Sequence, residues 1–365
     1  MNKIKLLCIL HRSPPTHGAA KVGDFISKSK KLQKEFDCQF ITIKSSNSIG
    51  DIGKINFKKL YLVVELYIKI FIALIFFRPD KIYFTASISS VAFYRDVLLS
   101  TLWKCYKLLK KTDVYYHYHT KGIDKFISIS NKNLKLTNFF LKDVNLILLS
   151  PLLKKDFEKI TTYNEILYLP NGIDNNINNF ENYINIKYTN IDKINILYLA
   201  HMIKEKGYWD VLELAKNSKK KNIHYHFAGN WGDKKQEEAF LIFIKKYNLE
   251  EYITYHGFVS GEEKGNLFKQ AHILIYPSKN DAFPLTLLES LSYGVPVLAT
   301  AEGSISYIID TKSGIVIQDI KKLSNGLNNS IKKFITQDTA YYCRKRYLDN
   351  FTLGQFENRL LEVLQ

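Results

Sequence analysis

Cysteine is scarce in this sequence. The 365 residues include only Cys8, Cys38, Cys105 and Cys343, which lie far apart and form no Cys-x-x-Cys pair. A disulfide framework or a structural zinc site needs regularly spaced cysteines, so the sequence indicates neither. A reducing cytosol fits this cysteine usage.

The sequence also lacks an uninterrupted apolar segment long enough to span a membrane. The longest candidate, residues 60–80, contains Glu65 and Lys69, whose charges would be costly in hydrocarbon. We therefore predict a largely buried helix that ends at Arg78–Pro79, because proline disfavours helix at the preceding residue. The start of the chain contains Lys5 and no small-residue cleavage site, which favours a buried strand over a secretory signal.

Acidic residues are few in the first half of the chain. Residues 1–170 contain 28 Lys and Arg against 13 Asp and Glu, net +15, whereas residues 171–365 contain 24 against 22, net +2. Such an excess suggests that one domain meets an anionic surface, either nucleic acid or the cytoplasmic face of a membrane. The alternative is that abundant lysine simply keeps the protein soluble.

Strand-like segments alternate with helix-like segments along the whole chain. The predicted strands are residues 3–9, 38–43, 81–86, 113–119 and 144–150 in the first half and 194–200, 223–229, 252–258, 273–278, 295–300 and 313–317 in the second. This alternation is typical of parallel sheets covered by helices on both faces. An Asn- and Asp-rich segment, residues 169–193, opens with a Pro-Asn-Gly turn and marks a domain boundary. We predict an α/β protein with two Rossmann-like, doubly wound domains facing each other across a cleft. These domains are residues 1–168 and 169–350, with a C-terminal helix, 351–365, that packs back toward the first domain.

Two acidic residues accompany a predicted apolar helix in residues 281–300, DAFPLTLLESLSYGVPVLAT. Pro284 is well placed to open this helix and Gly294 to close it. Asp281 then lies in the loop before the helix, and Glu289 lies inside it. The free N–H groups of a first helical turn can bind a phosphate, and a carboxylate deeper in the helix can accept hydrogen bonds from a ribose.

This spacing resembles the EX7E signature of the retaining glycosyltransferases of family 4, with Asp281 in place of the first Glu. The segments LPNGID, ILYLAHMIKEKGYWDVLELA, HYHFAGNWGD and ITYHGFVSGEEKGNLFKQAHILIYPS also look like parts of that family's nucleotide-sugar domain. The resemblance covers residues 168–318 and reaches the first half only loosely. It implies the GT-B fold, and some segments look like polysaccharide-assembly members.

The resemblance implies a donor site in the second domain. Lys206 matches the lysine that neutralises the donor diphosphate, and Glu289 matches the acid that holds the ribose hydroxyls. Asp281 matches the acid directed at the donor sugar. The backbone of Phe283, Pro284 and Leu285 is expected to approach the sugar and phosphates.

The sequence departs from the family pattern at two positions of this domain. The usual Gly-Arg after the first strand is Ala200–His201 here, so the arginine that would place a permanent positive charge beside the diphosphate is replaced by a histidine. His201 is retained as a donor-binding candidate. Tyr307 stands where members of the family commonly have Glu.

The resemblance implies three further features in the first domain. Gly18 lies where the family has a glycine-rich loop whose backbone reaches the phosphates. His119 matches the histidine near the donor sugar; His117 is the second choice, because strand alternation turns it into the sheet. Ser87 to Ser90 are expected near the acceptor.

The implied reaction moves a sugar from a UDP- or GDP-linked donor to a hydroxyl of a lipid-linked glycan, with retention of anomeric configuration. The setting would be assembly of a surface polysaccharide, namely O-antigen, lipopolysaccharide, capsule or exopolysaccharide. His119, Lys206 and Asp281 are the catalytic candidates. No metal or other cofactor is expected, and the sequence lacks a convincing DxD motif. The enzyme would be cytoplasmic and peripheral on the inner face of the membrane.

Three other functions remain open on the sequence alone. A sugar-nucleotide epimerase of similar architecture would transform its donor without an acceptor. A basic nucleic-acid-binding protein would show salt-sensitive binding, although the aromatics lie in strand-like segments and no nucleic-acid module is present. A non-catalytic member of the family is the third alternative, suggested by His201.

Overall fold

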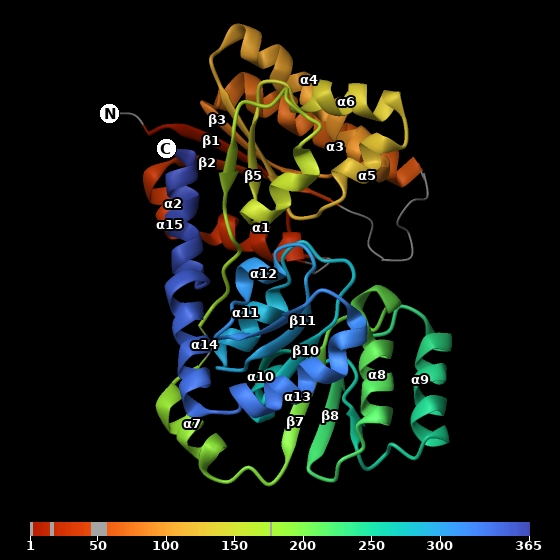
Figure 1. Ribbon diagram of the computed structural model, residues 1–365. Helices are drawn as coiled ribbons and strands as arrows, with labels where there is room; N and C mark the ends of the chain where they lie inside the picture. Colours follow the sequence, from red (N-terminus) through yellow and green to blue (C-terminus); the bar gives the residue numbers. More distant parts are fainter. Residues whose placement is uncertain (1–2, 15–17, 45–56, 176) are drawn as a thin grey trace. The chain divides into compact units, whose positions relative to one another are not determined.

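The computed structural model describes residues 3–14, 18–44, 57–175 and 177–365, with the side chains of residues 57–59 left out. The chain divides into two compact units. The first comprises Met1–Asn171 and Leu353–Gln365, and the second comprises Gly172–Thr352. Each unit contains one parallel sheet with helices on its faces (Figure 1). The predicted α/β architecture with two domains is therefore confirmed.

The sheet of the first unit has six strands in the order β2-β1-β3-β4-β5-β6. All five pairs of neighbouring strands are parallel, so each connection crosses from one end of the sheet to the other. The strands match the predicted segments except β6, which the sequence did not reveal. Their bounds are β1 Lys5–His11, β2 Asp37–Ile43, β3 Lys81–Ala86, β4 Asp113–Tyr118, β5 Asn145–Leu148 and β6 Ile166–Tyr168.

Helices from both ends of the chain cover one face of this sheet. The core there joins Leu6 and Leu10 of β1 and Ile26 of α1 to Phe356 and Leu360 of α15. The C-terminal helix therefore belongs to the first unit. The helices of the unit are α1 Gly18–Lys28, α2 Lys30–Glu35, α3 Phe57–Ile72, the π-helical turn η2 Ala73–Phe77, α4 Ser90–Leu109, α5 Ile123–Ser128, α6 Asn131–Leu141, the 3-10 helix η3 Pro151–Phe157 and α15 Leu353–Leu364.

The sheet of the second unit also has six strands, in the order β12-β11-β10-β7-β8-β9. All six were predicted. Their bounds are β7 Ile194–Leu199, β8 Ile223–Ala228, β9 Ile253–Tyr255, β10 Ile273–Tyr276, β11 Val297–Thr300 and β12 Gly314–Ile317. The helices are α7 Phe180–Thr189, η4 Lys204–Lys206, α8 Tyr208–Asn217, α9 Lys234–Lys246, α10 Gly261–Gln270, α11 Leu285–Ser292, α12 Ile305–Ile308, η5 Ile320–Lys322, α13 Leu323–Phe334 and α14 Gln337–Asn350.

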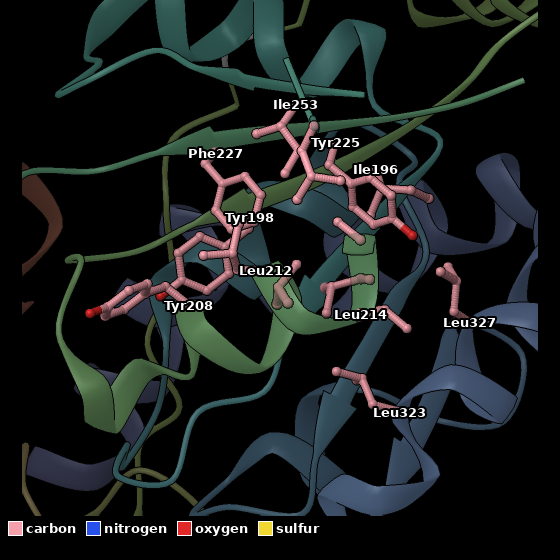
Figure 2. Packing of buried hydrophobic residues seen from close by; sticks show 14 of the residues in the cluster. Ile196, Tyr198, Tyr208, Leu212, Leu214, Tyr225, Phe227, Ile253, Leu323 and Leu327 are labelled. Carbon is pink, nitrogen blue, oxygen red and sulfur yellow. The ribbon is translucent and has the colours of Figure 1, made fainter. Parts of the chain in front are cut away.

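The core of the second unit is aromatic on its strand side. Tyr198 of β7 and Tyr225 and Phe227 of β8 are buried against Leu212 of α8 and Leu327 of α13 (Figure 2). Alternate residues of β8, His224 and His226, therefore point to the other face of the sheet. This core fixes the carboxyl ends of the strands, where open α/β sheets bind ligands.

The prediction that residues 60–80 form a largely buried helix is wrong. The segment is helical, as α3 and η2, but only 22% of Leu60–Phe77 is buried. Leu66 and Ile70 are buried, whereas Ile68 and Phe76 are exposed. Apolar residues occupy both sides of this helix, so its periodicity did not reveal that only one side packs on the unit.

Candidate functional site: the carboxyl ends of strands β7 and β10

The loops after β7 and β10 bring Lys206 and Asp281 together. The Lys206 Nζ lies 2.6 Å from Asp281 Oδ2 and also donates to the carbonyl oxygen of Asn280 at 2.9 Å. The backbone N–H of Lys279 donates to the carbonyl oxygen of Glu205, which ties the two loops together. Two residues that lie 75 positions apart in the chain are thereby held as one ion pair.

Two hydroxyl groups complete the surroundings of the Asp281 carboxylate. Tyr276 at the end of β10 and Ser278 just after it donate to Asp281 Oδ2 at 2.7 and 2.9 Å. Burial, followed by the charge of Asp281, raises the pKa of Tyr276 well above its ordinary value, so its hydroxyl stays protonated and can donate. Neither residue was predicted from the sequence, although the Tyr-Pro-Ser end of the predicted strand was the available signal.

Helix α11 begins at Leu285, after the loop that carries Asp281, as predicted. Pro284 is its N-cap residue and Gly294, with φ +67°, follows its end. Pro284 has no N–H, and the N-cap makes no side-chain hydrogen bond, so no capping side chain covers the first N–H groups. An anion placed there would meet backbone donors and the positive end of the helix dipole.

Glu289 lies inside α11 and is paired with a lysine of the neighbouring helix. Its Oε1 lies 2.5 Å from Lys264 Nζ of α10, and both side chains keep some exposure to solvent. Gly265 allows the two helices to approach, because a Cβ there would lie 2.7 Å from the Tyr293 hydroxyl. Lys264 was not predicted from the sequence, since nothing in a lone helical lysine indicates its partner.

The loop after β11 is pressed against the Asp281 loop. Ser304 N–H donates to the carbonyl oxygen of Ala282, and Gly303 has φ +53°. A Cβ on Gly303 would lie 2.1 Å from the carbonyl oxygen of Asp281, so only glycine allows this approach. The position of Asp281 therefore depends on three loops, those after β7, β10 and β11.

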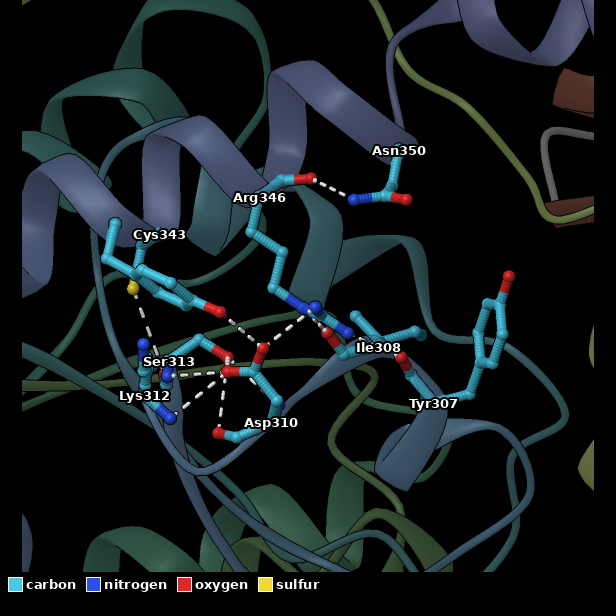
Figure 3. A network of polar contacts seen from close by, with 9 residues as sticks. Tyr307, Ile308, Asp310, Lys312, Ser313, Cys343, Arg346 and Asn350 are labelled. Carbon is cyan, nitrogen blue, oxygen red and sulfur yellow. Dashed lines mark hydrogen bonds and ion pairs between the residues drawn. The ribbon is translucent and has the colours of Figure 1, made fainter.

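A polar network holds the segment around Tyr307, which stands where the resemblance expects Glu. Arg346 of α14 donates to the carbonyl oxygens of Tyr307 and Ile308 and pairs with Asp310 (Figure 3). Burial by itself would raise the pKa of Asp310, but hydrogen bonds from Tyr342 and other donors outweigh it, so this pKa is lowered. The Tyr307 ring lies 6.4 Å from that of Phe283, between centroids.

His201 lies at the end of β7 and shares a hydrogen bond with a residue of the next strand's loop. Its Nδ1 lies 2.5 Å from Asn230 Oδ1, and the side chain is exposed. Met202 and Trp231 continue the two strands as an isolated bridge. The structure thus joins His201 to the loop after β8, whereas Lys206 is joined to the loop after β10.

The first-unit candidates also follow strand ends. His119 comes directly after β4, and its ring centroid lies 4.0 Å from that of His117. His117 is fully buried, as strand alternation predicted, and shares a short hydrogen bond with the Tyr83 hydroxyl. Burial, with a smaller contribution from His119, lowers the pKa of His117 well below its ordinary value, so this ring is neutral.

Gly18 and the serine segment occupy the start of helices in the first unit. Gly18 begins α1 and is exposed, with nothing within 4 Å of a Cβ built there. The close approach in this region belongs to Gly23, where a Cβ would lie 1.9 Å from the carbonyl oxygen of His11. Ser87 N–H donates to buried Asp96 at 2.8 Å, and Ser90 begins α4 with φ +65°.

Histidines of β8 form a second cluster in the second unit. His226 Nδ1 lies 3.0 Å from His256 Nε2, and His224 shares a hydrogen bond with Thr254. Among the residues with described positions, no group of three or more His, Cys, Asp or Glu side chains is arranged to hold a metal ion.

Comparison with known proteins finds glycosyltransferases. Residues 179–346, just under half of the chain, match the family Glycosyl transferases group 1. The chain is 26% identical over 239 residues to the 2-deoxystreptamine N-acetyl-D-glucosaminyltransferase of Niallia circulans, covering 64% of this chain and 58% of that relative. It is 23% identical over 137 residues to the putative colanic acid biosynthesis glycosyltransferase WcaL of Escherichia coli K12, covering 34% of this chain and 32% of the relative.

A solved structure extends the likeness to the whole chain. Anabaena Alr3699/HepE in complex with UDP and glucose has a TM-score of 0.68 and 14% identity, with 99% of each chain covered. At that identity the likeness shows the fold, which is GT-B. The matched family, the named relatives and the fold together support a glycosyltransferase of the GT-B type.

Proposed function

We propose that the protein is a retaining glycosyltransferase of family 4 that transfers a sugar from a nucleoside diphosphate sugar to a glycan hydroxyl. The observation that carries this proposal is the Lys206–Asp281 pair in front of the first turn of α11. A cation, a set of backbone N–H groups and an acid converge there, at the carboxyl ends of the strands. Such a set suits a diphosphate joined to a sugar.

Each residue has a proposed task. The Lys206 ammonium and the N–H groups at the start of α11 stabilise the negative charge that develops on the departing diphosphate. Asp281, oriented by Tyr276 and Ser278, accepts hydrogen bonds from the donor sugar, and Glu289, oriented by Lys264, accepts them from the ribose. His119 is proposed to face the donor sugar, and Gly18 and His201 to contact the donor phosphates.

The attack is proposed to occur on the face from which the diphosphate departs, with a diphosphate oxygen taking the acceptor proton. The new glycosidic bond then keeps the donor's anomeric configuration. Positioning and charge stabilisation supply the catalysis, so the enzyme needs no metal in this proposal. Fixed protein donors are effective because they do not reorganise when the charge develops.

The acceptor is proposed to be a lipid-linked glycan in surface polysaccharide assembly, at the cytoplasmic face of a membrane. Support comes from the colanic acid named for WcaL and from the basic first half of the chain. The proposed donor is UDP- or GDP-linked, supported by the UDP named for Alr3699/HepE. The comparisons do not favour an epimerase or a nucleic-acid-binding protein.

The proposal is tested by product analysis on the full chain. The enzyme is incubated with UDP- and GDP-sugars and polyprenyl-diphosphate-linked sugar acceptors, with EDTA or magnesium, and the linkage is assigned by NMR. Lys206→Met is expected to lower kcat about 10²- to 10³-fold, as loss of one charge-stabilising donor does. Lys279→Met is the matched control, because Lys279 lies in the adjoining loop and pairs with Asp210 instead.

Three results would contradict the proposal. An inverted anomeric configuration would exclude the retaining mechanism. Conversion of the donor without any acceptor would indicate an epimerase. Equal kcat in Lys206→Met and wild type would remove Lys206 from the catalytic group.

A further inference from the structure

Helix α3 and the turn η2 expose a continuous apolar surface, here called the α3 face. It consists of side chains that are 48–78% exposed: Tyr61, Val64, Ile68, Phe71, Ile72, Ile75 and Phe76. Their spacing of three, four and seven residues places them along one side of the helix. The helices of soluble proteins normally turn polar residues to solvent, so this side needs a partner.

The opposite side of the same helix already has its partner. Leu66, Ile70, Ala73 and Leu74 are buried in the first unit. The side of α3 that packs on the core is therefore already buried, and the exposed side chains lie on the other side of the helix. Contiguous exposed apolar surface of this extent marks a protein or membrane interaction site.

The neighbouring helix also exposes apolar side chains. Helix α4 packs beside α3, and it exposes Val91, Tyr94 and Leu98, which are again three and seven residues apart. Their exposed fractions are 44–51%. The two helices lie next to each other in the first unit in Figure 1. A surface built from two helices is broader than a single peptide-binding stripe.

The charges around this surface identify the kind of partner. Residues 57–110 contain nine Lys and Arg against three Asp and Glu. All three acids are paired with bases: Glu65 with Lys44 and Lys69, Asp80 with Lys110, and Asp96 with Arg95. The surplus is basic, which suits anionic lipid headgroups and opposes a second copy of the same surface.

The connections of α3 exclude a membrane-spanning position, although Leu60–Phe77 is long and apolar enough to cross a membrane. Strands β2 and β3, which α3 joins, both pair with β1 in one parallel sheet. A spanning helix would put β2 and β3 on opposite sides of the bilayer. The helix can therefore lie only in the plane of the interface, with one side in the lipid and the other on the sheet.

We propose that the α3 face, together with the exposed apolar side chains of α4, is a membrane-docking surface that inserts into the headgroup region of an anionic leaflet. Lys44 and Lys69, both more than half exposed, lie beside it and contact the headgroups. The inference rests on the proposed function only for its biological purpose, which is to hold the first unit at the surface that carries a lipid-linked acceptor. Lipid binding itself is measured without the reaction.

The test is flotation of the full chain with vesicles of phosphatidylglycerol and phosphatidylethanolamine, compared with vesicles of phosphatidylcholine alone. Wild type is expected to float with the anionic vesicles. Phe71→Ser combined with Phe76→Ser is expected to weaken that binding at least tenfold, because two aromatic side chains no longer leave water. Lys69→Gln is expected to weaken it less and to reduce its dependence on salt.

A matched control comes from the second unit. Ile242 of α9 is 65% exposed, within the exposure range of the α3 face. Ile242→Ser is expected to float like wild type. Circular dichroism of every variant checks that the chain is folded, and titration of UDP and GDP measures nucleotide binding separately. Nucleotide binding without flotation overturns the docking surface alone, whereas flotation without binding of any nucleotide overturns the proposed function alone.

Two further results would overturn the docking surface. In one, the Phe71→Ser, Phe76→Ser variant floats like wild type. In the other, wild type is a dimer by light scattering and becomes a monomer in that variant, which would make the α3 face an interface between two copies of this chain.

Discussion

Helices α3 and α11 are both strongly apolar and each contains one glutamate, yet they are placed differently in their units. Leu287, Leu288 and Leu291 of α11 are completely buried, and Glu289 emerges toward Lys264. Along α3, apolar side chains lie on both sides and Glu65 pairs with Lys44 and Lys69. A carboxylate in an apolar helix thus has two explanations: Glu289 is the proposed ribose-binding residue of α11, whereas Glu65 is a charge-paired residue at the border of an exposed face of α3.

The two units also differ in charge and in the surface that they expose. The second unit is nearly neutral by sequence, and its site is fixed by contacts among the loops after β7, β10 and β11. The first unit is basic and exposes apolar helices. We infer that the second unit recognises a soluble ligand and the first a surface.

The largest expected difference concerns stability. Leu288→Ala in α11 removes a fully buried side chain, so it is expected to lower the free energy of unfolding by about 2–5 kcal/mol. Ile68→Ala in α3, at a half-exposed position, is expected to change it by less than about 0.5 kcal/mol. Hydrogen exchange by mass spectrometry, read separately for the two units, measures both. Equal destabilisation by the two substitutions would mean that the α3 face is packed.

A smaller difference is expected between two glycines. In Gly303→Ala the alanine must adopt a left-handed backbone conformation, and its Cβ meets the carbonyl oxygen of Asp281. The free energy of unfolding is therefore expected to fall by about 1–3 kcal/mol. The Cβ added by Gly18→Ala would have nothing within 4 Å, so the free energy of unfolding is expected to stay within about 0.5 kcal/mol of wild type. Denaturant titration of both variants checks this. A stable Gly303→Ala variant would show that the Asp281 loop adapts freely.

The smallest effect is a pH dependence that arises in the second unit. Burial, and next the charge of Lys187, lowers the pKa of His272 to about 4, and its Nδ1 accepts a hydrogen bond from the Asn195 N–H at 3.0 Å. The unfolded chain takes up this proton first, near pH 6.5. The free energy of unfolding should therefore fall as pH drops from about 6.5 to about 4, and between pH 7 and pH 6 this residue contributes a fall of less than about 1 kcal/mol.

His272→Asn keeps an acceptor without the titration. It should flatten the pH dependence, measured by denaturant titration at several pH values. His201→Asn is the control, because His201 is exposed in the same unit. An unchanged pH dependence in His272→Asn would contradict the assignment to His272.

Much of the fold was readable from the sequence, because strand-like segments alternated regularly with helices. Strand β6 was missed because its three residues, Ile166–Tyr168, are only half-buried and carry no periodicity. The placement of α3 was mispredicted for the opposite reason. Apolar residues occupy both sides of this helix, and hydrophobic periodicity identifies the buried side only when the other side is polar.

The candidate site was readable only in part. Asp281, Glu289 and Lys206 stood in recognisable segments, so their positions at strand and helix ends followed from the chain. Lys264 and Tyr276 did not, because which lysine or tyrosine reaches a given carboxylate is decided by tertiary packing. The pairing of Lys206 with Asp281 was missed for the same reason.

Calorimetric titration of UDP and GDP tests whether Glu289 of α11 is the ribose-binding acid of a nucleotide-sugar site. One of the two nucleotides is expected to bind wild type in the presence of EDTA. Binding should weaken about tenfold or more in Glu289→Gln, which loses charged hydrogen bonds, and stay unchanged in Glu65→Gln of α3. Equal affinity in wild type and Glu289→Gln, or no binding of either nucleotide, would contradict this role of Glu289.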